Sequence, residues 1–327
     1  MKFLTARHWL ASAMLATSCA ALVAPTATYA QGDKLTKFIL PVAAGSGVDT
    51  IIRASQKSLS TSLGTAVVIE NQPGAGGIVG TQALVKAAPD GTTLSVVSNN
   101  HVIYPSVYKS LPFDPVADIT PIAVMGTTPL VLVVNPKVAA KDSKELVALL
   151  KAKPDSLNYA SSGNGTILHL AAEMFLDEAG VKAKHIPYKG VGPMVTDLIG
   201  GQVDFGVLAL PSIQAHLKSG ALRAIGTSSK ARLAAAPDIP TFAEQGLSNY
   251  LVEGWFAVIG PKHLPAAEVK RVHTAFTAAF ASAEVKESMG KQGNSITIST
   301  PEAAGSFFKS ELDKYARLVK KAGVKLD

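Results

Sequence analysis

Cysteine is almost absent from this chain. The 327 residues include one, Cys19, and it lies in an apolar segment near the N-terminus. If that segment is removed as a signal peptide, the mature protein has no thiol, no disulfide and no cysteine chemistry. No other stretch is long and apolar enough to span a membrane. The lysines are scattered and no aromatic residues alternate with them, which argues against a nucleic-acid-binding surface.

Several enzyme motifs are also missing. Gly74–Gly80 follows a strand pattern and opens a helix pattern, but Val79 stands where the dinucleotide fingerprint needs its third glycine. No Lys-Ser or Lys-Thr follows, so this is not a P-loop. Ser46 and Ser162 flank glycines without forming a G-x-S-x-G elbow. No two histidines have the helical spacing of a zinc site. We therefore expect no metal and no cofactor.

Residues 1–30 have the pattern of a secretory signal peptide. Lys2 and Arg7 form a basic start, Trp9 to Leu22 is largely apolar, and Thr28-Tyr29-Ala30 is a small-x-small cleavage site. This segment is too short and wrongly flanked for a stable anchor, so we expect the protein to be exported. The formal net charge of +7 suits an anionic ligand, although this is weak support.

A strand–loop–helix junction follows the signal peptide and organises the chain. Phe38 to Leu40 reads as a buried strand that stops at Pro41, and a helix begins at Asp49. Between them lie small residues, over which a ligand can reach the unpaired backbone N–H groups at the positive end of the helix. The junction therefore predicts an anion-binding site for carboxylate or phosphate.

The same motif recurs one unit later. Val67 to Glu70 is a strand, Asn71 to Gly77 a glycine-rich turn, and Ile78 to Ala88 a helix. The glycines of one loop alone could serve only to make a tight turn. Two such loops at the carboxyl ends of adjacent parallel strands favour ligand binding. The residues that we expect in this site are Ala43, Ala44, Gly45, Ser46, Gly47, Asp49, Gly74, Ala75, Gly76 and Gly77.

Strands and helices keep alternating, which predicts a parallel α/β architecture in the second half as well. Further strand–loop–helix junctions follow the strands at 158–160 and 184–187, and helices are expected at 143–153 (capped by Ser143) and 167–179. Short apolar strands are expected near 122–125 and 130–134, and a short helix at 241–245. Apolar stripes predict core-facing helices at 266–281 and 301–322.

At this point several motifs resemble the Bug (TctC-like) family, the periplasmic substrate-binding components of tripartite tricarboxylate transporters. The resemblance covers essentially the whole mature chain. It is carried by Pro41, Gly45-Ser46-Gly47-Val48-Asp49, Arg53, Glu70 to Gly77, Ala88 to Gly91, Leu111 to Pro115, Ser161 to Thr166, Ile186 to Gly190, Asp197 to Asp204, Trp255 and Thr300-Pro301-Glu302.

The resemblance implies a type 2 periplasmic-binding-protein fold, with two α/β domains, a ligand cleft and two crossover strands. It implies a periplasmic, non-enzymatic protein that hands a di- or tricarboxylate, an acidic amino acid or an aromatic acid to integral membrane transporter subunits. One carboxylate is typically held by backbone amides of the two first-domain loops, here Ala43–Gly47 and Gly74–Gly77. The family usually has Phe at Val42 and Gly-Gly at Gly45-Ser46, so the ligand's identity does not carry over from any relative.

Polar residues near the other loops are expected to contact the remainder of the ligand and to determine specificity. They are Asn99, His101, Ser161, Thr166, Tyr188, Lys189 and Asp204. His185 and Trp255 are interpreted as structural residues. The predicted domains are 31–130 with 251–327, and 131–250. We expect a monomer with no nucleic-acid partner. The alternative is an exported hydrolase or oxidoreductase that uses the same cleft.

Overall fold

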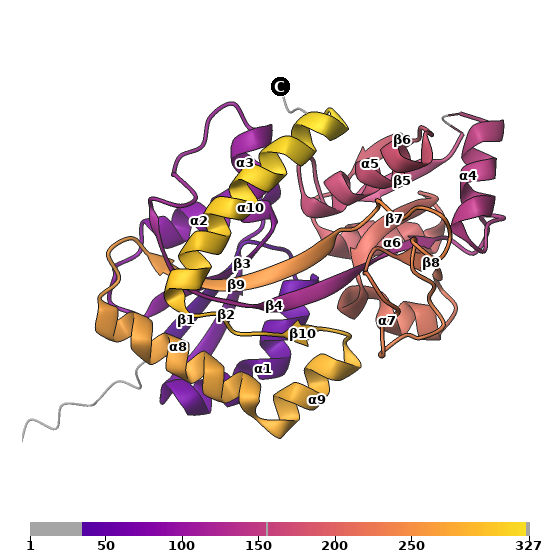
Figure 1. Cartoon of the computed structure of the whole chain (residues 1–327). Helices are drawn as coiled ribbons and strands as arrows, with labels where there is room; N and C mark the ends of the chain where they lie inside the picture. The colour runs from indigo at the N-terminus through magenta and orange to yellow at the C-terminus, as the bar shows by residue number, and fades with distance from the viewer. Residues whose placement is uncertain (1–34, 155, 325–327) are drawn as a thin grey trace, which may run out of the picture. The chain divides into compact units, whose positions relative to one another are not determined.

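The fold begins with the first predicted strand–loop–helix junction. In the computed structural model, which describes residues 35–154 and 156–324, β1 (Leu35–Leu40) leads through a short loop into α1 (Gly47–Leu63) (Figure 1). The Ser46 hydroxyl caps α1 by accepting a hydrogen bond from the Asp49 amide (3.3 Å), and the left-handed Gly64 ends it. The predicted signal peptide lies outside the described residues.

Strands and helices alternate through most of the remaining chain. In order they are β2 (Ala66–Asn71), the 3-10 helix η1 (Ala75–Gly77), α2 (Ile78–Val85), β3 (Thr93–Ser98), α3 (Asn100–Val107), β4 (Ile119–Val134), α4 (Ser143–Ala152), β5 (Asn158–Ser161), α5 (Ile167–Ala179), β6 (Lys184–Pro187), α6 (Val191–Gly200), β7 (Phe205–Ala209), α7 (Leu210–Lys218), β8 (Arg223–Thr227), β9 (Glu253–Pro261), α8 (Ala266–Ala281), α9 (Ala283–Lys291), β10 (Ser295–Ile296) and α10 (Pro301–Ala322). No helix of the described ranges is long and apolar enough to cross a membrane.

The strands follow the order β2-β1-β3-β9-β4-β7-β5-β6, with β8 and β10 also paired to β4. The predicted parallel pairs exist in both halves: β1 pairs in parallel with β2 and β3, and β5 with β6 and β7. Between these two groups lie β9 and β4, which pair antiparallel with each other and with their other neighbours β3 and β7 (Figure 1). The parallel pairing therefore holds within each group, and β9 and β4 are the strands that cross between them, in agreement with the two crossover strands expected.

Strand β4 connects the two groups. It is one strand of 16 residues, where the sequence predicted two short strands. Its first part pairs with β9 as far as Pro129, and from Leu130 to Val134 it pairs with β7 and β8. The change of partner falls next to the predicted domain boundary at 130. The division into residues 31–130 with 251–327, and 131–250, stays a prediction.

Other differences are local. The cap of α4 is Asp142, whose carboxylate accepts from the Glu145 amide (2.8 Å), and Ser143 is the first helical residue. Residues 241–245 form turns instead of a helix, and α9 and β10 were not predicted. The terminal helices agree with their predictions to the residue, since α8 spans 266–281 and α10 spans 301–322.

His101 shows how a polar residue enters the core. It was expected at the sheet edge, but α3 begins at Asn100 and turns the His101 ring into the interior, where 1% of the residue is exposed. The ring lies on Phe113 (centroids 6.4 Å apart) and edge-on to Phe308 (5.5 Å), and Nε2–H donates to the Pro115 carbonyl (2.6 Å). Burial lowers the pKa of His101 to about 4, although the nearby Asp114 acts in the opposite direction.

This burial predicts a pH-dependent stability. Near neutral pH His101 is uncharged in both states. Below pH 6.5 the unfolded chain binds a proton before the folded one, so stability is lost as the pH falls from about 6.5 to about 4, by up to about 3 kcal/mol in total. In His101→Gln, the side-chain amide still donates to Pro115 but does not titrate. We expect urea unfolding of this variant to depend less steeply on pH over this range.

Phe113→Leu is the matched control, because it loses the same stacking contact without removing a titratable group. It should lower the free energy of unfolding by a similar amount at every pH. A His101→Gln profile that runs parallel to the wild-type profile would contradict the assignment.

Candidate functional site

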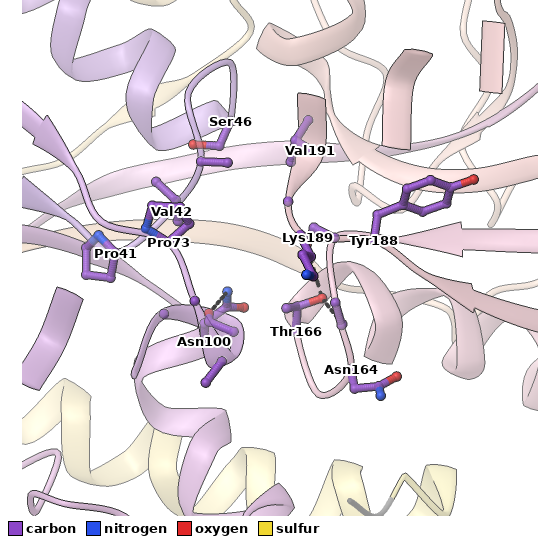
Figure 2. A pocket seen from close by; sticks show the side chains of 18 of the residues that line it. Pro41, Val42, Ser46, Pro73, Asn100, Asn164, Thr166, Tyr188, Lys189 and Val191 are labelled. Atoms are coloured by element: carbon purple, nitrogen blue, oxygen red, sulfur yellow. Dashed lines mark hydrogen bonds between the residues drawn. The ribbon is translucent and has the colours of Figure 1, made fainter. Parts of the chain in front are cut away.

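A cavity of about 680 Å³ opens where the predicted loops meet. One wall is formed by the loops after β1 and β2 together with Asn100 and Tyr108, and the other wall by the loops after β5 and β6 (Figure 2). All four loops follow the carboxyl ends of parallel strands, the edge at which open α/β sheets bind ligands. The cavity therefore lies at the sheet edge where the sequence predicts the site.

The cavity brings together about half of the predicted site residues. Those that line it are Ala43, Ser46, Gly74, Ala75, Gly76, Gly77, Thr166, Tyr188 and Lys189. Those that do not are Ala44, Gly45, Gly47, Asp49, Asn99, His101, Ser161 and Asp204.

The cavity lining carries positive charge and no negative charge. Lys189 is its only charged side chain, and no aspartate or glutamate contributes to the wall. Within the described part of the chain, Lys189 makes no ion pair within 4.0 Å. The other polar groups are hydroxyls, amides and backbone N–H groups, so the cavity is suited to an anion and unsuited to a cation.

Asp49, in the first turn of α1, stabilises the loop after β1 and does not line the cavity. Its carboxylate is 4% exposed and accepts from the Gly45 amide (2.9 Å), Arg53 Nε (2.8 Å) and Asn71 Nδ2 (3.0 Å). The Gly45 amide, predicted to hold the ligand, is therefore used inside the protein. Ser46 Oγ accepts from the Asp49 amide, so its own proton remains available to an anion in the cavity.

The loop after β2 presents backbone donors. Gly74, Gly76 and Gly77 have φ values of 131°, 71° and 126°, which favour glycine. The Gly76 carbonyl accepts from Tyr104 Oη (2.9 Å) and Asn100 Nδ2 (3.2 Å). Among the described residues, the amides of Ala75 and Gly76 have no hydrogen-bond acceptor, and both residues line the cavity. Both amides belong to the loop Gly74–Gly77, one of the two loops from which the sequence predicts carboxylate binding.

Two histidines, His169 and His185, form hydrogen bonds to the loop after β5. His169 Nδ1 accepts from the Gly165 amide (3.1 Å), and His185 Nε2 donates to Ser161 Oγ (2.7 Å), which in turn donates to the Gly163 carbonyl (3.1 Å). The imidazoles stack with their centroids 3.9 Å apart. Burial lowers the pKa of His169 to about 3 and that of His185 to about 4. Both rings are therefore neutral at pH 7 and serve as structural hydrogen-bonding groups.

Thr166 and Tyr188 are also tied to their own half of the molecule. Thr166 caps α5 by accepting from the His169 amide (3.4 Å) and donates to the Gly163 carbonyl (2.8 Å). The Tyr188 hydroxyl donates to Asp197 (2.8 Å), and its ring points away from the opposite wall (Figure 2). Lys189 is exposed and lines the same cavity as Thr166 and Tyr188.

Three of the predicted ligand contacts lie away from this cavity, and the structure shows why. Asn99 lies one residue before α3 and bonds Tyr315 Oη (2.6 Å) and the Trp255 amide (2.9 Å), deep in the core. His101 is buried on the other side of α3, as described above. Asp204 precedes β7, whereas the loops follow their strands, so it lies at the opposite sheet end, where it accepts from the Asn158 amide (2.7 Å).

Among the lining residues that the sequence did not predict as site residues are Asn100, Tyr108 and Asn164. The run Asn99-Asn100-His101 contained the right signal, but its register was off by one residue. No cluster of three or more metal-binding side chains (His, Cys, Asp, Glu) occurs in residues 35–154 and 156–324.

Comparison with known proteins gives consistent matches. The family model for the tripartite tricarboxylate transporter family receptor matches residues 51–324. Protein BugT of Bordetella pertussis is 34% identical over 309 residues, which cover 94% of this chain and 95% of BugT.

Solved structures agree. The periplasmic binding protein BugD superposes with a TM-score of 0.85 and 31% identity over 89% of this chain and 98% of BugD. A Rhodopseudomonas palustris protein solved with adipate gives a TM-score of 0.86 and 26% identity over 89% of this chain and 98% of its own. These structures confirm the expected two-domain periplasmic-binding-protein fold.

Proposed function

Because this chain belongs to the family of tripartite tricarboxylate transporter receptors, whose members are solute-binding proteins and not enzymes, we propose that it binds a small carboxylate in the cavity of Figure 2. The predicted signal peptide and the family support a periplasmic location. In this proposal the loaded protein delivers its ligand to the integral membrane subunits of a tripartite transporter, as a monomer.

The main support for the proposal is that no aspartate or glutamate lines the cavity. Two unpaired amides, the Ser46 hydroxyl and the Lys189 ammonium group border one cavity that contains no carboxylate of its own. Its volume of about 680 Å³ lies within the range that proteins use for small ligands. The relative solved with adipate supports a ligand with carboxylates at both ends.

A calorimetric screen tests this function. The panel contains citrate, malate, adipate, glutamate and benzoate, with glucose as the neutral control. We expect heat and a raised melting temperature with at least one carboxylate, no binding of glucose, and no turnover. Product formation from any member would favour the alternative of an exported hydrolase or oxidoreductase.

If the backbone amides of Ala75 and Gly76 hold the carboxylate, Gly76→Val should weaken binding more than Lys189→Ala does. A charge-assisted hydrogen bond contributes about 1.5–3 kcal/mol, so losing both amides in Gly76→Val should weaken binding more than about a hundredfold. Lys189 is exposed, and an exposed ion pair contributes at most about 1 kcal/mol, so Lys189→Ala should weaken binding about fivefold or less. Isothermal titration with the tightest panel ligand measures both.

Gly64→Val is the control for backbone strain. Gly64 has a φ of 66°, close to the 71° of Gly76, but it ends α1 and a side chain there would meet no atom within 4 Å. It should retain binding, with circular dichroism confirming that all variants fold. If the lysine variant loses binding while Gly76→Val keeps it, the ligand is held by charge and not by backbone amides.

We also propose that binding is coupled to closure of the cavity. β9 and β4 connect the two strand groups, so the two walls can hinge on these strands, and a ligand that contacts both walls favours the closed arrangement. At the start of α1, a Cβ on Gly47 would lie 2.9 Å from the Ala209 Cβ at the end of β7. Gly47→Ala should therefore act as a wedge between the two groups.

Small-angle X-ray scattering tests the wedge. With saturating ligand, the radius of gyration of the wild type should decrease, and that of Gly47→Ala should decrease less. Gly192→Ala is matched, because Gly192 also lies in the first turn of a helix and a Cβ there meets no atom within 4 Å. It should follow the wild type. Equal compaction of all three proteins would refute this closure model.

A further inference from the structure

Asn100 bonds both walls of the cavity. It is the first residue of α3, is 7% exposed and lines the cavity on the wall opposite Thr166 (Figure 2). Its Nδ2 donates to the Gly76 carbonyl (3.2 Å) in the loop after β2. Its Oδ1 accepts from the Ile167 amide (2.8 Å) at the start of α5 on the other wall. One side chain thus connects the Gly74–Gly77 loop to the opposing helix.

The Gly76 carbonyl and the Ile167 amide together require a neutral side-chain amide at position 100. A carbonyl only accepts and a backbone N–H only donates, so Asn100 must present nitrogen to Gly76 and oxygen to Ile167. A carboxylate at this position would keep the bond to Ile167 but would place a second oxygen against the Gly76 carbonyl. It would also add a negative charge to an acid-free cavity.

The bond to Ile167 completes the cap of α5. The first amides of a helix have no partner within it. Thr166 Oγ1 accepts from the His169 amide (3.4 Å), and the Ile167 amide is left to Asn100. An oxygen at this position is also favoured by the positive end of the helix dipole. Because Asn100 lies on the opposite wall, this part of the cap exists only while the walls are together.

The segment before α5 also packs closely against the end of α3. A Cβ on Gly165 would lie 2.9 Å from Val107 Cγ1, at the other end of α3. The φ of Gly165 is 68°, so this position favours glycine for its backbone as well as for the space. The start of α5 therefore docks along α3 from Asn100 to Val107.

We propose that Asn100 is the latch that couples carboxylate binding to closure. With Tyr104 it fixes the Gly76 carbonyl, which keeps the amides of Ala75 and Gly76 directed at the ligand. Its second bond caps α5 in the closed arrangement only. Asn100 is thus a positioning residue whose two bonds depend on each other, and this inference rests on the proposed carboxylate-binding function.

Hydrogen exchange of the backbone amides tests the latch. Wild type, Asn100→Ala, Asn100→Asp and the control Asn249→Ala are compared with and without the tightest-binding carboxylate of adipate, citrate, malate, glutamate and benzoate. Asn249 is exposed, far from the cavity lining, and its amide bonds only Glu178 (3.0 Å). Ligand should protect the Ile167 amide in the wild type and in Asn249→Ala.

In Asn100→Ala this protection should be lost, compaction in X-ray scattering should diminish, and affinity should fall about tenfold. Asn100→Asp should bind more weakly still, by up to about a hundredfold, although it retains an acceptor for Ile167. Circular dichroism and the melting temperature establish that the variants are folded.

The outcomes separate the two proposals. If the wild type binds none of these carboxylates, the proposed function fails and the latch with it. If the wild type binds and protects Ile167, and Asn100→Ala does the same with similar affinity, the latch alone is refuted. Equal affinity of Asn100→Asp and the wild type would also overturn it.

Discussion

The site depends on how the unpaired backbone N–H groups at the helix starts are shared between the protein and its ligand. Every α/β junction creates such donors. Some of these N–H groups donate within the protein. The Gly45 amide donates to the Asp49 carboxylate, the Gly165 amide to His169 Nδ1, and the Ile167 amide to Asn100 Oδ1. The amides of Ala75 and Gly76 are left over at the cavity wall within the described structure. In the proposed function, specificity for an anion follows from this division and not from any single side chain.

Local signals in the sequence predicted the parts of this arrangement that depend on neighbouring residues. Glycines that need positive φ, such as Gly76, and caps such as Ser46 and Thr166 are encoded within a few positions, so both loops were found. Asn99, Asn100 and His101 show the limit. All three follow β3, but only their packing against β9, the Gly76 loop and Phe308 decides that Asn100 alone faces the cavity. That packing joins segments far apart in the chain.

Strand β4 shows the same limit for the fold. Pro121, Gly126 and Pro129 all weaken a strand pattern, so two short strands were expected. The structure accommodates these residues with register shifts around Pro121 and Gly126 along β9, and the strand continues through Pro129. Pairing with distant strands therefore overrides local preference. Because β9 and β4 connect the two groups of strands, the two walls of the cavity are joined through these two strands, which is the arrangement on which the proposed closure depends.

Backbone donors also suit a protein that must both take up and release its ligand. A charged side chain held in a closing cavity has to be desolvated, and without a partner it would be costly to bury. Amides of a braced loop carry no net charge and lose no side-chain entropy when the ligand arrives. The neutral His169 and His185 follow the same principle under the other wall, where they position a loop without adding charge. In the proposed function, the exposed Lys189 attracts an anion to the cavity without being buried, and the backbone amides hold it there.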